Sequence, residues 1–217
     1  MPTFPQGDQK FVEHRLSRRT LLTRICGAGS ALLLSNCAGQ RSTWVDPAFH
    51  RTEVDYPSKL ARGTIVVDPD SHFLYLVEGG GRALRYGVGV GAEGYGWSGV
   101  ATVRSRQAWP DWHPTREYLE HHPKLVAAMH PLETGYGMAG GPENPLGARA
   151  LYLWQGSKDT LYRIHGTNEP WTIGTDVSAG CIRLTNQDIV DLYERVPVGT
   201  KVVVQPSKNA PGRGGTA

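Results

Sequence analysis

Residues 164–184 decide the fold and read IHGTNEPWTIGTDVSAGCIRL. A β-rich run ends at His165, a glycine-containing loop follows, and a capped helix is expected just after Cys181. His165 lies sixteen residues before Cys181, close enough for a returning loop to bring imidazole and sulfur together. Such a pair is the minimum for covalent acyl transfer, because the imidazole activates the thiol and then protonates the leaving amine.

The surroundings of Cys181 predict a reactive thiol. Backbone N–H groups of the loop and the Arg183 guanidinium create a positive potential, which is expected to lower the thiol pKa. The N–H groups of Gly180 and Cys181 are candidate oxyanion donors, and glycine permits a close approach. The alternative is a small buried apolar residue, as most free cysteines are. No histidine follows Cys181, so a papain-like residue order is excluded.

Short β-rich runs, separated by turns rich in glycine and aspartate, dominate the rest of the chain. Two of these runs, 151–154 and 161–164, are expected to pair across a turn at 156–159. Seven such runs favour an all-β sandwich or barrel. The runs are 64–67, 73–77, 83–90, 100–103, 151–154, 161–164 and 201–204.

Helix signals are few. Thr185 is a candidate N-cap with an acidic first turn after it, and Ile189 and Leu192 share one apolar face before Pro197 ends the helix. A second short helix is expected over 115–122.

The chain has 217 residues, enough for one good core and short for two. Its net charge of +3 comes from residues 1–37, which hold five basic and two acidic side chains, so the remainder is neutral. A neutral body argues against a nucleic-acid groove, which needs clustered basic charge. The body has one cysteine, Cys181, and this excludes a disulfide-stapled scaffold.

Residues 1–37 have the layout of an export signal, with Arg18 and Arg19 before a short apolar run. The paired arginines and mild hydrophobicity resemble the twin-arginine class of signals. Cys37 ends the lipobox-like sequence LSNC and is a candidate for acylation, with ordinary cleavage just after it as the alternative. Residues 38–61 are mixed and polar and predict a tether or an extended wrap.

Two motifs carry a family resemblance: His165-Gly166, and the pattern Ser-x-Gly-Cys-x-Arg over 178–183. They resemble the L,D-transpeptidase catalytic domain (YkuD-type, ErfK-like). The stretch NPLGARAL at 144–151 is similar to that family's approach to the histidine, and WPDWHPT at 109–115 to its substrate-side insertion. The resemblance covers about Gly63 to Val204 and implies a mainly β fold, a mixed β-sandwich with one or two short helices. It places the catalytic domain at 62–206. Independently, the Pro-, Gly- and Lys-rich composition of 205–217 predicts a flexible tail at 207–217.

The resemblance also implies peptidoglycan cross-linking in the periplasm or cell envelope, without a cofactor. Cys181 would attack the third residue of a stem tetrapeptide, with His165 as base and the Gly166 carbonyl orienting the imidazole. D-Alanine would leave, and an amine would resolve the thioester as a 3–3 link. The resemblance leaves the acceptor open between a second stem, an envelope lipoprotein, a D-amino acid and water. Ser178 is expected to shape the loop, and Arg183 to be structural or to bind an anion.

Several aromatic residues are candidates for substrate contact. Trp109, Trp112 and Trp171 are expected to line a groove for stem peptide or glycan, with packing in the core as the alternative. Arg149 is either an ordinary strand charge or a ligand for a substrate carboxylate. No metal is expected, because the remaining histidines lack zinc-ligand spacing. Those histidines are His113, His121, His122 and His130.

Two other functions compete with the transpeptidase. A sortase-like thiol transpeptidase also places histidine first, but expects a Thr-Leu-x-Thr-Cys strand and a later catalytic arginine that this chain lacks. A non-catalytic envelope-binding protein is the other alternative, and the intact His165 and Cys181 argue against it. Membrane contact is expected only through a lipid on Cys37.

Overall fold

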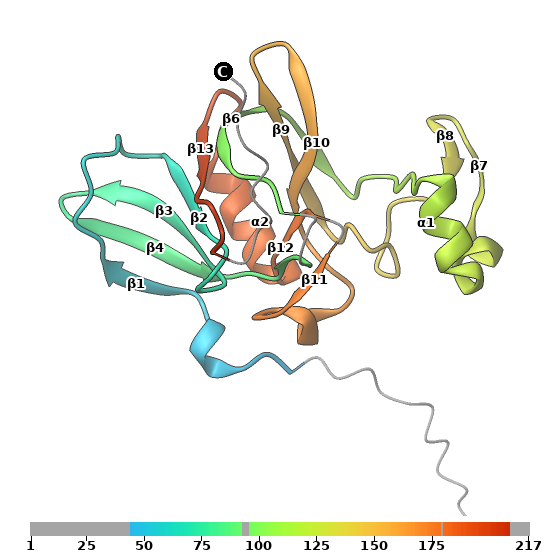
Figure 1. The fold of residues 1–217 in the computed structure, drawn as a ribbon, viewed down its shortest axis with the longest axis horizontal. Coiled ribbons are helices and arrows are strands. Elements are labelled where there is room, and N and C mark those ends of the chain that lie inside the picture. The colour runs from blue at the N-terminus through green and yellow to red at the C-terminus, as the bar shows by residue number, and fades with distance from the viewer. Residues whose placement is uncertain (1–43, 93–95, 179, 209–217) are drawn as a thin grey trace, which may run out of the picture. The chain divides into compact units, whose positions relative to one another are not determined.

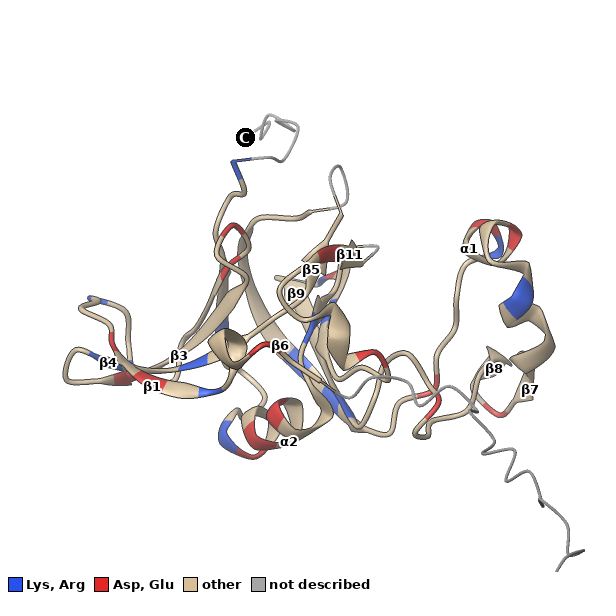
Figure 2. Cartoon of the chain, turned by 90° about the horizontal axis from the view of Figure 1, so that it is seen from below, with Lys and Arg blue, Asp and Glu red and all other residues tan. Residues whose placement is uncertain are grey.

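The structure, a computed structural model, describes residues 44–92, 96–178 and 180–208. The described residues form one nine-stranded sheet and two two-stranded sheets, with α1 and α2 as their α-helices. Figure 1 shows β1 to β4 at one end of the main sheet and β9 and β10 toward the other, and Figure 2 shows α2 on one side of the sheet. The prediction of a mainly β, mixed fold with one or two short helices is confirmed.

The main sheet has the strand order β1-β4-β3-β2-β13-β6-β9-β10-β12. The pairs β2–β13 and β10–β12 are parallel, and the other neighbours are antiparallel. Its strands are β1 (Thr52–Asp55), β2 (Ile65–Asp68), β3 (Phe73–Gly79), β4 (Arg82–Gly87), β6 (Gly99–Ala108), β9 (Arg149–Gln155), β10 (Lys158–His165), β12 (Ile182–Arg183) and β13 (Lys201–Val204).

Smaller elements surround this sheet. The sheet pairs are β5 with β11 and β7 with β8. Their bounds, with those of the helices, are η1 (Pro47–Phe49), β5 (Val90–Gly91), α1 (Arg116–His121), η2 (Pro123–Ala128), β7 (His130–Leu132), β8 (Gly135–Gly137), η3 (Pro170–Thr172), β11 (Asp176–Ser178) and α2 (Asn186–Arg195).

The last strand of the chain joins the two halves of the main sheet. β13 pairs in parallel with β2 and antiparallel with β6, so Val203 lies opposite both Val66 and Val100. Alternate residues of these strands face the core, as the period of a strand requires, and Val202 is fully buried. On α2, Ile189 and Leu192 are fully buried and close the core from one side.

All seven predicted β runs overlap strands of the structure. The run 83–90 is divided, because β4 ends at Gly87 and Gly89 forms an isolated bridge with Arg183. A Cβ on Gly89 would lie 2.7 Å from the Thr172 carbonyl oxygen, so this close approach requires glycine. The division brings the β5 segment against the loop that leads to Cys181.

The predicted helices are also present. Thr185 caps α2 by accepting the Asp188 N–H through its hydroxyl, and the helix ends at Arg195, before Pro197. The two-residue strand β12, which the sequence did not indicate, lies between Cys181 and this helix. The short helix expected over 115–122 is α1, with Thr115 as its N-cap.

The described part of the segment 38–61 lies on the sheet as an extended wrap. β1 pairs antiparallel with β4, with Val54 opposite Ala83. At the far end of this pair, the Arg82 guanidinium lies 2.6 Å from Asp55 and 3.6 Å from Glu53. In Figure 2 both β1 and β4 carry basic and acidic segments of ribbon. The sequence missed β1 because its four residues carry no apolar alternation.

Candidate active site

The two motifs of the 164–184 stretch meet on neighbouring strands. β10 ends at His165, and β12 begins directly after Cys181. The strands are parallel, with Ile164 opposite Ile182 and His165 opposite Arg183. Ile164 and Ile182 both face the core, so alternation places His165 and Cys181 together on the other face. The register separates their Cα atoms by about 8 Å, which the imidazole and thiol side chains can bridge.

The His165 imidazole is buried and held in one orientation. Its exposed fraction is 3%, and its Nδ1 lies 2.6 Å from the carbonyl oxygen of Gly166. A carbonyl only accepts, so Nδ1 carries the proton and Nε2 presents a lone pair. Burial, with the nearby Arg183 charge, lowers the pKa of His165 to about 4. The imidazole is therefore neutral at neutral pH, the protonation state that a general base requires.

The Cys181 thiol is less acidic than the sequence predicts. Desolvation raises its pKa, although a hydrogen bond from the Arg163 backbone and the charges of Arg163 and Arg183 lower it. The expectation of a lowered pKa is therefore wrong, because burial outweighs the positive potential. Cys181 is nevertheless partly exposed. The structure thus has a protonated thiol and a neutral imidazole on neighbouring positions of one sheet face.

The loop before Cys181 is closed by Ser178. The Ser178 hydroxyl donates to the Cys181 carbonyl oxygen at 2.5 Å and accepts the Gly180 N–H at 3.2 Å. Gly180 has a φ of +117°. A Cβ added to Gly91 would lie 2.8 Å from the Gly180 Cα. The two glycines therefore let the loop pass close to the β5 segment. A small pocket borders this contact and is lined by Gly180 and, among others, Trp97 and Ile182.

Arg183 ties the site to the loop after His165. Its guanidinium lies 3.3 Å from the Glu169 carboxylate, and its backbone exchanges hydrogen bonds with Gly89 at 2.8 and 2.9 Å. The Arg183 side chain is 14% exposed, so a carboxylate partner offsets part of its desolvation. A substrate anion at Arg183 would compete with Glu169 for this guanidinium.

Asn186, in the first turn of α2, is a residue of the site that sequence reasoning missed. Its Oδ1 accepts the Ala148 N–H at 2.8 Å. A Cβ on Gly166 would lie 2.3 Å from this oxygen, so Asn186 stands directly against the residue that holds the His165 imidazole. The one signal in the sequence is an amide side chain at a helix start, where capping is the ordinary interpretation.

Of the tryptophans predicted to contact substrate, two are exposed and one is partly buried. Trp171, in η3, and Trp109, at the end of β6, are 40% and 44% exposed. Trp112 is partly buried and packs edge-to-face on Tyr118 at 5.6 Å between ring centroids. Arg149 precedes Ala150, the partner of His165, so its side chain points to the opposite face.

On that face the Arg149 guanidinium lies 5.3 Å from the Tyr193 ring of α2 and donates to the Ala148 carbonyl. The structure therefore does not bring Arg149 to Cys181.

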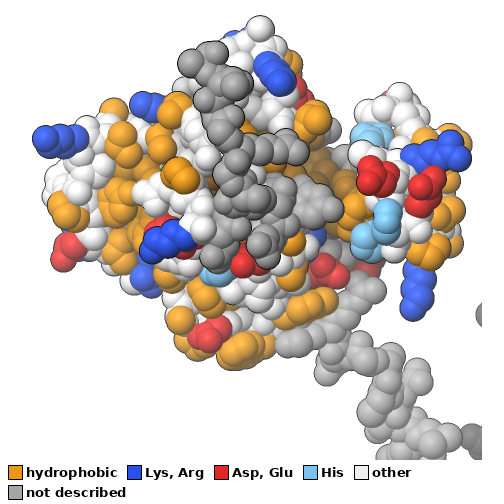
Figure 3. All heavy atoms as spheres, in the orientation of Figure 1, with side chains coloured by type: hydrophobic (Ala, Val, Ile, Leu, Met, Phe, Trp, Pro, Cys, Tyr) orange, Lys and Arg blue, Asp and Glu red, His pale blue; other side chains and the backbone are white. Residues whose placement is uncertain are grey.

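The insertion between β6 and β9 carries the histidine cluster. Figure 3 shows pale-blue histidine side chains on the surface of the part of the molecule that contains α1. In each of these histidines, Nδ1 lies 2.8 to 3.2 Å from a backbone carbonyl oxygen. Within the described residues, no group of three or more His, Cys, Asp and Glu side chains is placed to hold a metal ion. The residues are His113, His121, His122 and His130.

The remaining predictions concern the two ends of the chain, and residues 209–217 of the predicted tail lie outside the described residues. Cys37 and the export-type signal at 1–37 lie outside the described residues. Among the helices that are described, none has the length and apolar character needed to cross a membrane.

Comparisons with known proteins agree with these motifs. The family model of the L,D-transpeptidase catalytic domain (YkuD) matches residues 62–204. The chain is 35% identical over 150 residues to the probable L,D-transpeptidase YbiS of Escherichia coli K12, covering 67% of this chain and 45% of that protein. It is 35% identical over 162 residues to the probable L,D-transpeptidase ErfK/SrfK of the same organism, covering 70% and 47%. The chain thus spans about half the length of these relatives.

Among solved structures, a Brucella melitensis protein described as a probable carnitine operon oxidoreductase is 48% identical. The match covers 74% of this chain and 96% of that one, with a TM-score of 0.48.

Proposed function

This chain belongs to the L,D-transpeptidase (YkuD) family, and from that premise we propose that it is an exported cysteine transpeptidase acting on peptidoglycan stem peptides. One observation carries the proposal: His165 and Cys181 lie on one face of adjacent parallel strands, with the imidazole held by Gly166. A neutral, oriented imidazole beside a protonated thiol is the arrangement that base-assisted acyl transfer needs.

The first half-reaction forms a thioester. His165 Nε2 takes the Cys181 thiol proton while the sulfur attacks the carbonyl carbon of the L-centred third stem residue. The resulting tetrahedral oxyanion would be stabilised by backbone N–H groups of Gly180 and Cys181. The Gly180 N–H, which donates to the Ser178 hydroxyl at 3.2 Å, would then donate to the oxyanion instead. The C–N bond to D-alanine breaks as the imidazolium returns its proton to the leaving amine.

The second half-reaction releases the acyl group. An acceptor amine attacks the thioester, His165 takes the proton from the attacking nitrogen, and the C–S bond breaks. The thiolate regains its proton from the imidazolium, so the enzyme returns to its starting state. With a second stem as acceptor the product is a 3–3 cross-link. An envelope lipoprotein, a D-amino acid or water would give a different product from the same thioester.

We place this reaction in the periplasm or cell envelope. The support is the basic, then apolar, layout of residues 1–37, which is typical of an export signal. Acylation of Cys37 would add a lipid anchor, and palmitate labelling of wild type against Cys37→Ser tests this directly.

The nucleophile is tested by incubating the full chain with a carbapenem and measuring its intact mass. We expect one covalent adduct in wild type and none in Cys181→Ala, with His165→Gln slowing its formation by about a hundredfold or more. A folded wild-type chain that takes no adduct would favour a non-catalytic binding protein. An adduct that persists in Cys181→Ala would refute the nucleophile assignment.

The substrate is tested with a purified disaccharide-tetrapeptide. Release of D-alanine that requires Cys181 supports the first half-reaction, and the mass of the second product identifies the acceptor. Muropeptide analysis of a deletion strain then shows whether 3–3 links are lost in the cell.

A further inference from the structure

Residues 46–55, here called the strap, contact the loop that leads to Cys181 and the first two turns of α2. Phe49 of the strap enters a slot between β4 and the loop that follows η3. A Cβ on Gly87 would lie 2.4 Å from Phe49 Cβ, and one on Gly174 would lie 2.3 Å from Phe49 Cε2. The slot therefore exists because both positions are glycine, and Gly174 also has a φ of +86°. The Phe49 ring fills it as a wedge.

The wedge backs the loop that holds Cys181. Gly174 donates its N–H to the Val88 carbonyl at 3.0 Å, and Ala92 donates to the Ser178 carbonyl at 2.9 Å. The loop thus lies between Phe49 on one side and the β5 segment on the other. Ser178, at its end, makes the 2.5 Å hydrogen bond to the Cys181 carbonyl. Phe49 therefore packs against the beginning of the loop whose end is fixed to Cys181 by Ser178.

A second contact beside the wedge fixes the same loop. His72 Nε2 lies 2.8 Å from Asp176 Oδ1 on β11. The His72 ring also meets the Phe49 ring edge-to-face, with 6.5 Å between centroids. The strap and the β2–β3 turn therefore brace the loop together.

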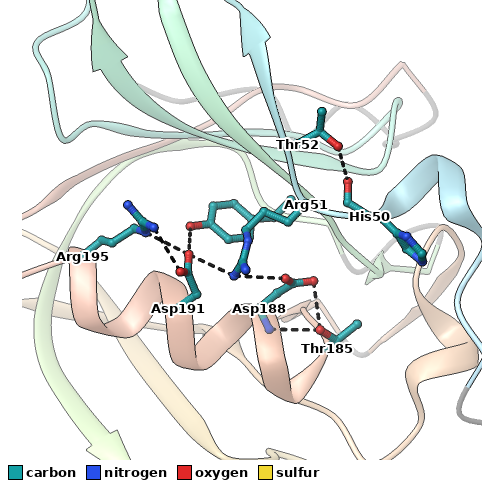
Figure 4. Close-up of polar contacts among 8 residues, drawn as sticks. His50, Arg51, Thr52, Thr185, Asp188, Asp191 and Arg195 are labelled. Carbon is teal, nitrogen blue, oxygen red and sulfur yellow. Dashed lines mark hydrogen bonds and ion pairs between the residues drawn. The ribbon is translucent and has the colours of Figure 1, made fainter.

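Two residues further along the strap, Arg51 contacts α2. Its Nη1 lies 3.2 Å from Asp191 Oδ2 and 3.6 Å from Asp188 Oδ1 (Figure 4). Asp188 is 8% exposed and also hydrogen-bonds Thr185, the N-cap of the helix. Burial raises the pKa of Asp188 and the Arg51 charge opposes that shift, so Arg51 is the cation that links the strap to the first turn of α2.

The first turn of α2 supports the residue that holds the His165 imidazole. Asn186 lies two residues before Asp188, and its Oδ1 packs against Gly166 while accepting the Ala148 N–H. The Gly166 carbonyl in turn accepts the His165 Nδ1–H. Arg51 is therefore connected to the imidazole through the start of α2.

We propose that Phe49 and Arg51 are positioning residues that together set the placement of the Cys181 thiol relative to the His165 imidazole. The inference rests on the proposed function, in which these two groups react as a pair. Neither strap residue needs to touch substrate. Each braces one partner, and a displacement of about 1 Å between reacting groups can cost a hundredfold in rate.

The test is the second-order rate constant for carbapenem acylation of Cys181 in the full chain, measured by intact mass well below each variant's Tm. We expect Phe49→Ala and Arg51→Gln each to slow acylation about tenfold or more. Phe49→Leu, which keeps an apolar wedge, and Arg51→Lys, which keeps the charge, should each recover part of the rate. Glu53→Gln is the matched control, because Glu53 lies on the strap, is exposed, and touches neither brace.

The outcomes separate the two proposals. If wild type is not acylated, the proposed function fails and the strap inference falls with it. If wild type is acylated and both variants keep its rate while folded, the strap inference is refuted and the proposed function stands. Equal slowing in Glu53→Gln would also refute the inference, because the effect would then be general. If Phe49→Ala does not fold, Arg51→Gln decides, since it leaves the wedge in place.

Discussion

Protonation of His165 is expected to destabilise the fold as the pH falls. Burial, with the Arg183 charge, lowers the pKa of this imidazole from 6.5 to about 4. Between these two values the unfolded chain binds more protons than the folded one, so the free energy of unfolding decreases with decreasing pH. The contribution of the neutral imidazole is complete above pH 6.5 and is lost through the window down to about pH 4.

The magnitude follows from the same shift. At 1.36 kcal/mol per pKa unit, the full window corresponds to about 3.4 kcal/mol, and the part between pH 7 and pH 4.5 to about 2.4 kcal/mol. Protonation of carboxyl groups with lowered pKa values, among them Asp159 and Asp191, also decreases the free energy of unfolding at acid pH. The informative quantity is therefore the difference between wild type and His165→Gln, in which the carboxyl contributions cancel.

The assay is urea unfolding, followed by tryptophan fluorescence, at pH 7, 6, 5 and 4.5. Wild type should lose about 2.4 kcal/mol more than His165→Gln between the ends of this range. His121→Gln, which removes an exposed imidazole, should behave like wild type. If wild type and His165→Gln show the same pH dependence, the imidazole is not buried in its neutral form and the reasoning fails.

Other predictions follow from single contacts. Thr185→Ala removes the N-cap oxygen of α2 and should lower the free energy of unfolding by about 1 kcal/mol, measured in urea; an unchanged midpoint would contradict this. Asn186→Ala leaves the Ala148 N–H without its acceptor and should cost about 1–3 kcal/mol and slow carbapenem acylation, whereas Asn186→Asp keeps the oxygen and should retain most of the rate. Arg183→Gln removes a charge that lowers the pKa of His165, so the acid limb of acylation should move to higher pH; an unmoved limb would exclude this electrostatic role. Burial raises the pKa of the Cys181 thiol, so iodoacetamide should alkylate it at pH 7 more slowly than free cysteine; a faster rate would contradict the desolvation.

The sequence predicts elements whose signals are local. The N-cap at Thr185 and the apolar pair Ile189 and Leu192 depend on neighbours in the chain, and α2 is found where they place it. β12 has two residues and no pattern of its own. β12 forms because the loop after His165 brings Ile182 opposite Ile164 on β10.

The candidate site divides in the same way. His165 and Cys181 could be named from motif and chain order, which are properties of the sequence. The pKa of the thiol could not, because the desolvation that raises it comes from the folded surroundings. Asn186 and Arg51 were missed because their partners lie far away in the chain: Ala148 is 38 residues from Asn186, and α2 follows Arg51 by more than a hundred. Such contacts leave no short-range pattern.

The pairing of β1 with β4 has a consequence for any shortened form of this protein. The region that matches the family's catalytic domain begins at residue 62, after β1 has ended. A chain cut to that boundary would leave the N–H and C=O groups that β4 directs toward β1 without partners at an open sheet edge. Open edges of this kind recruit strands from other molecules. We therefore expect the shortened chain to self-associate and aggregate more readily than the uncut chain, even with every residue of the reacting pair intact.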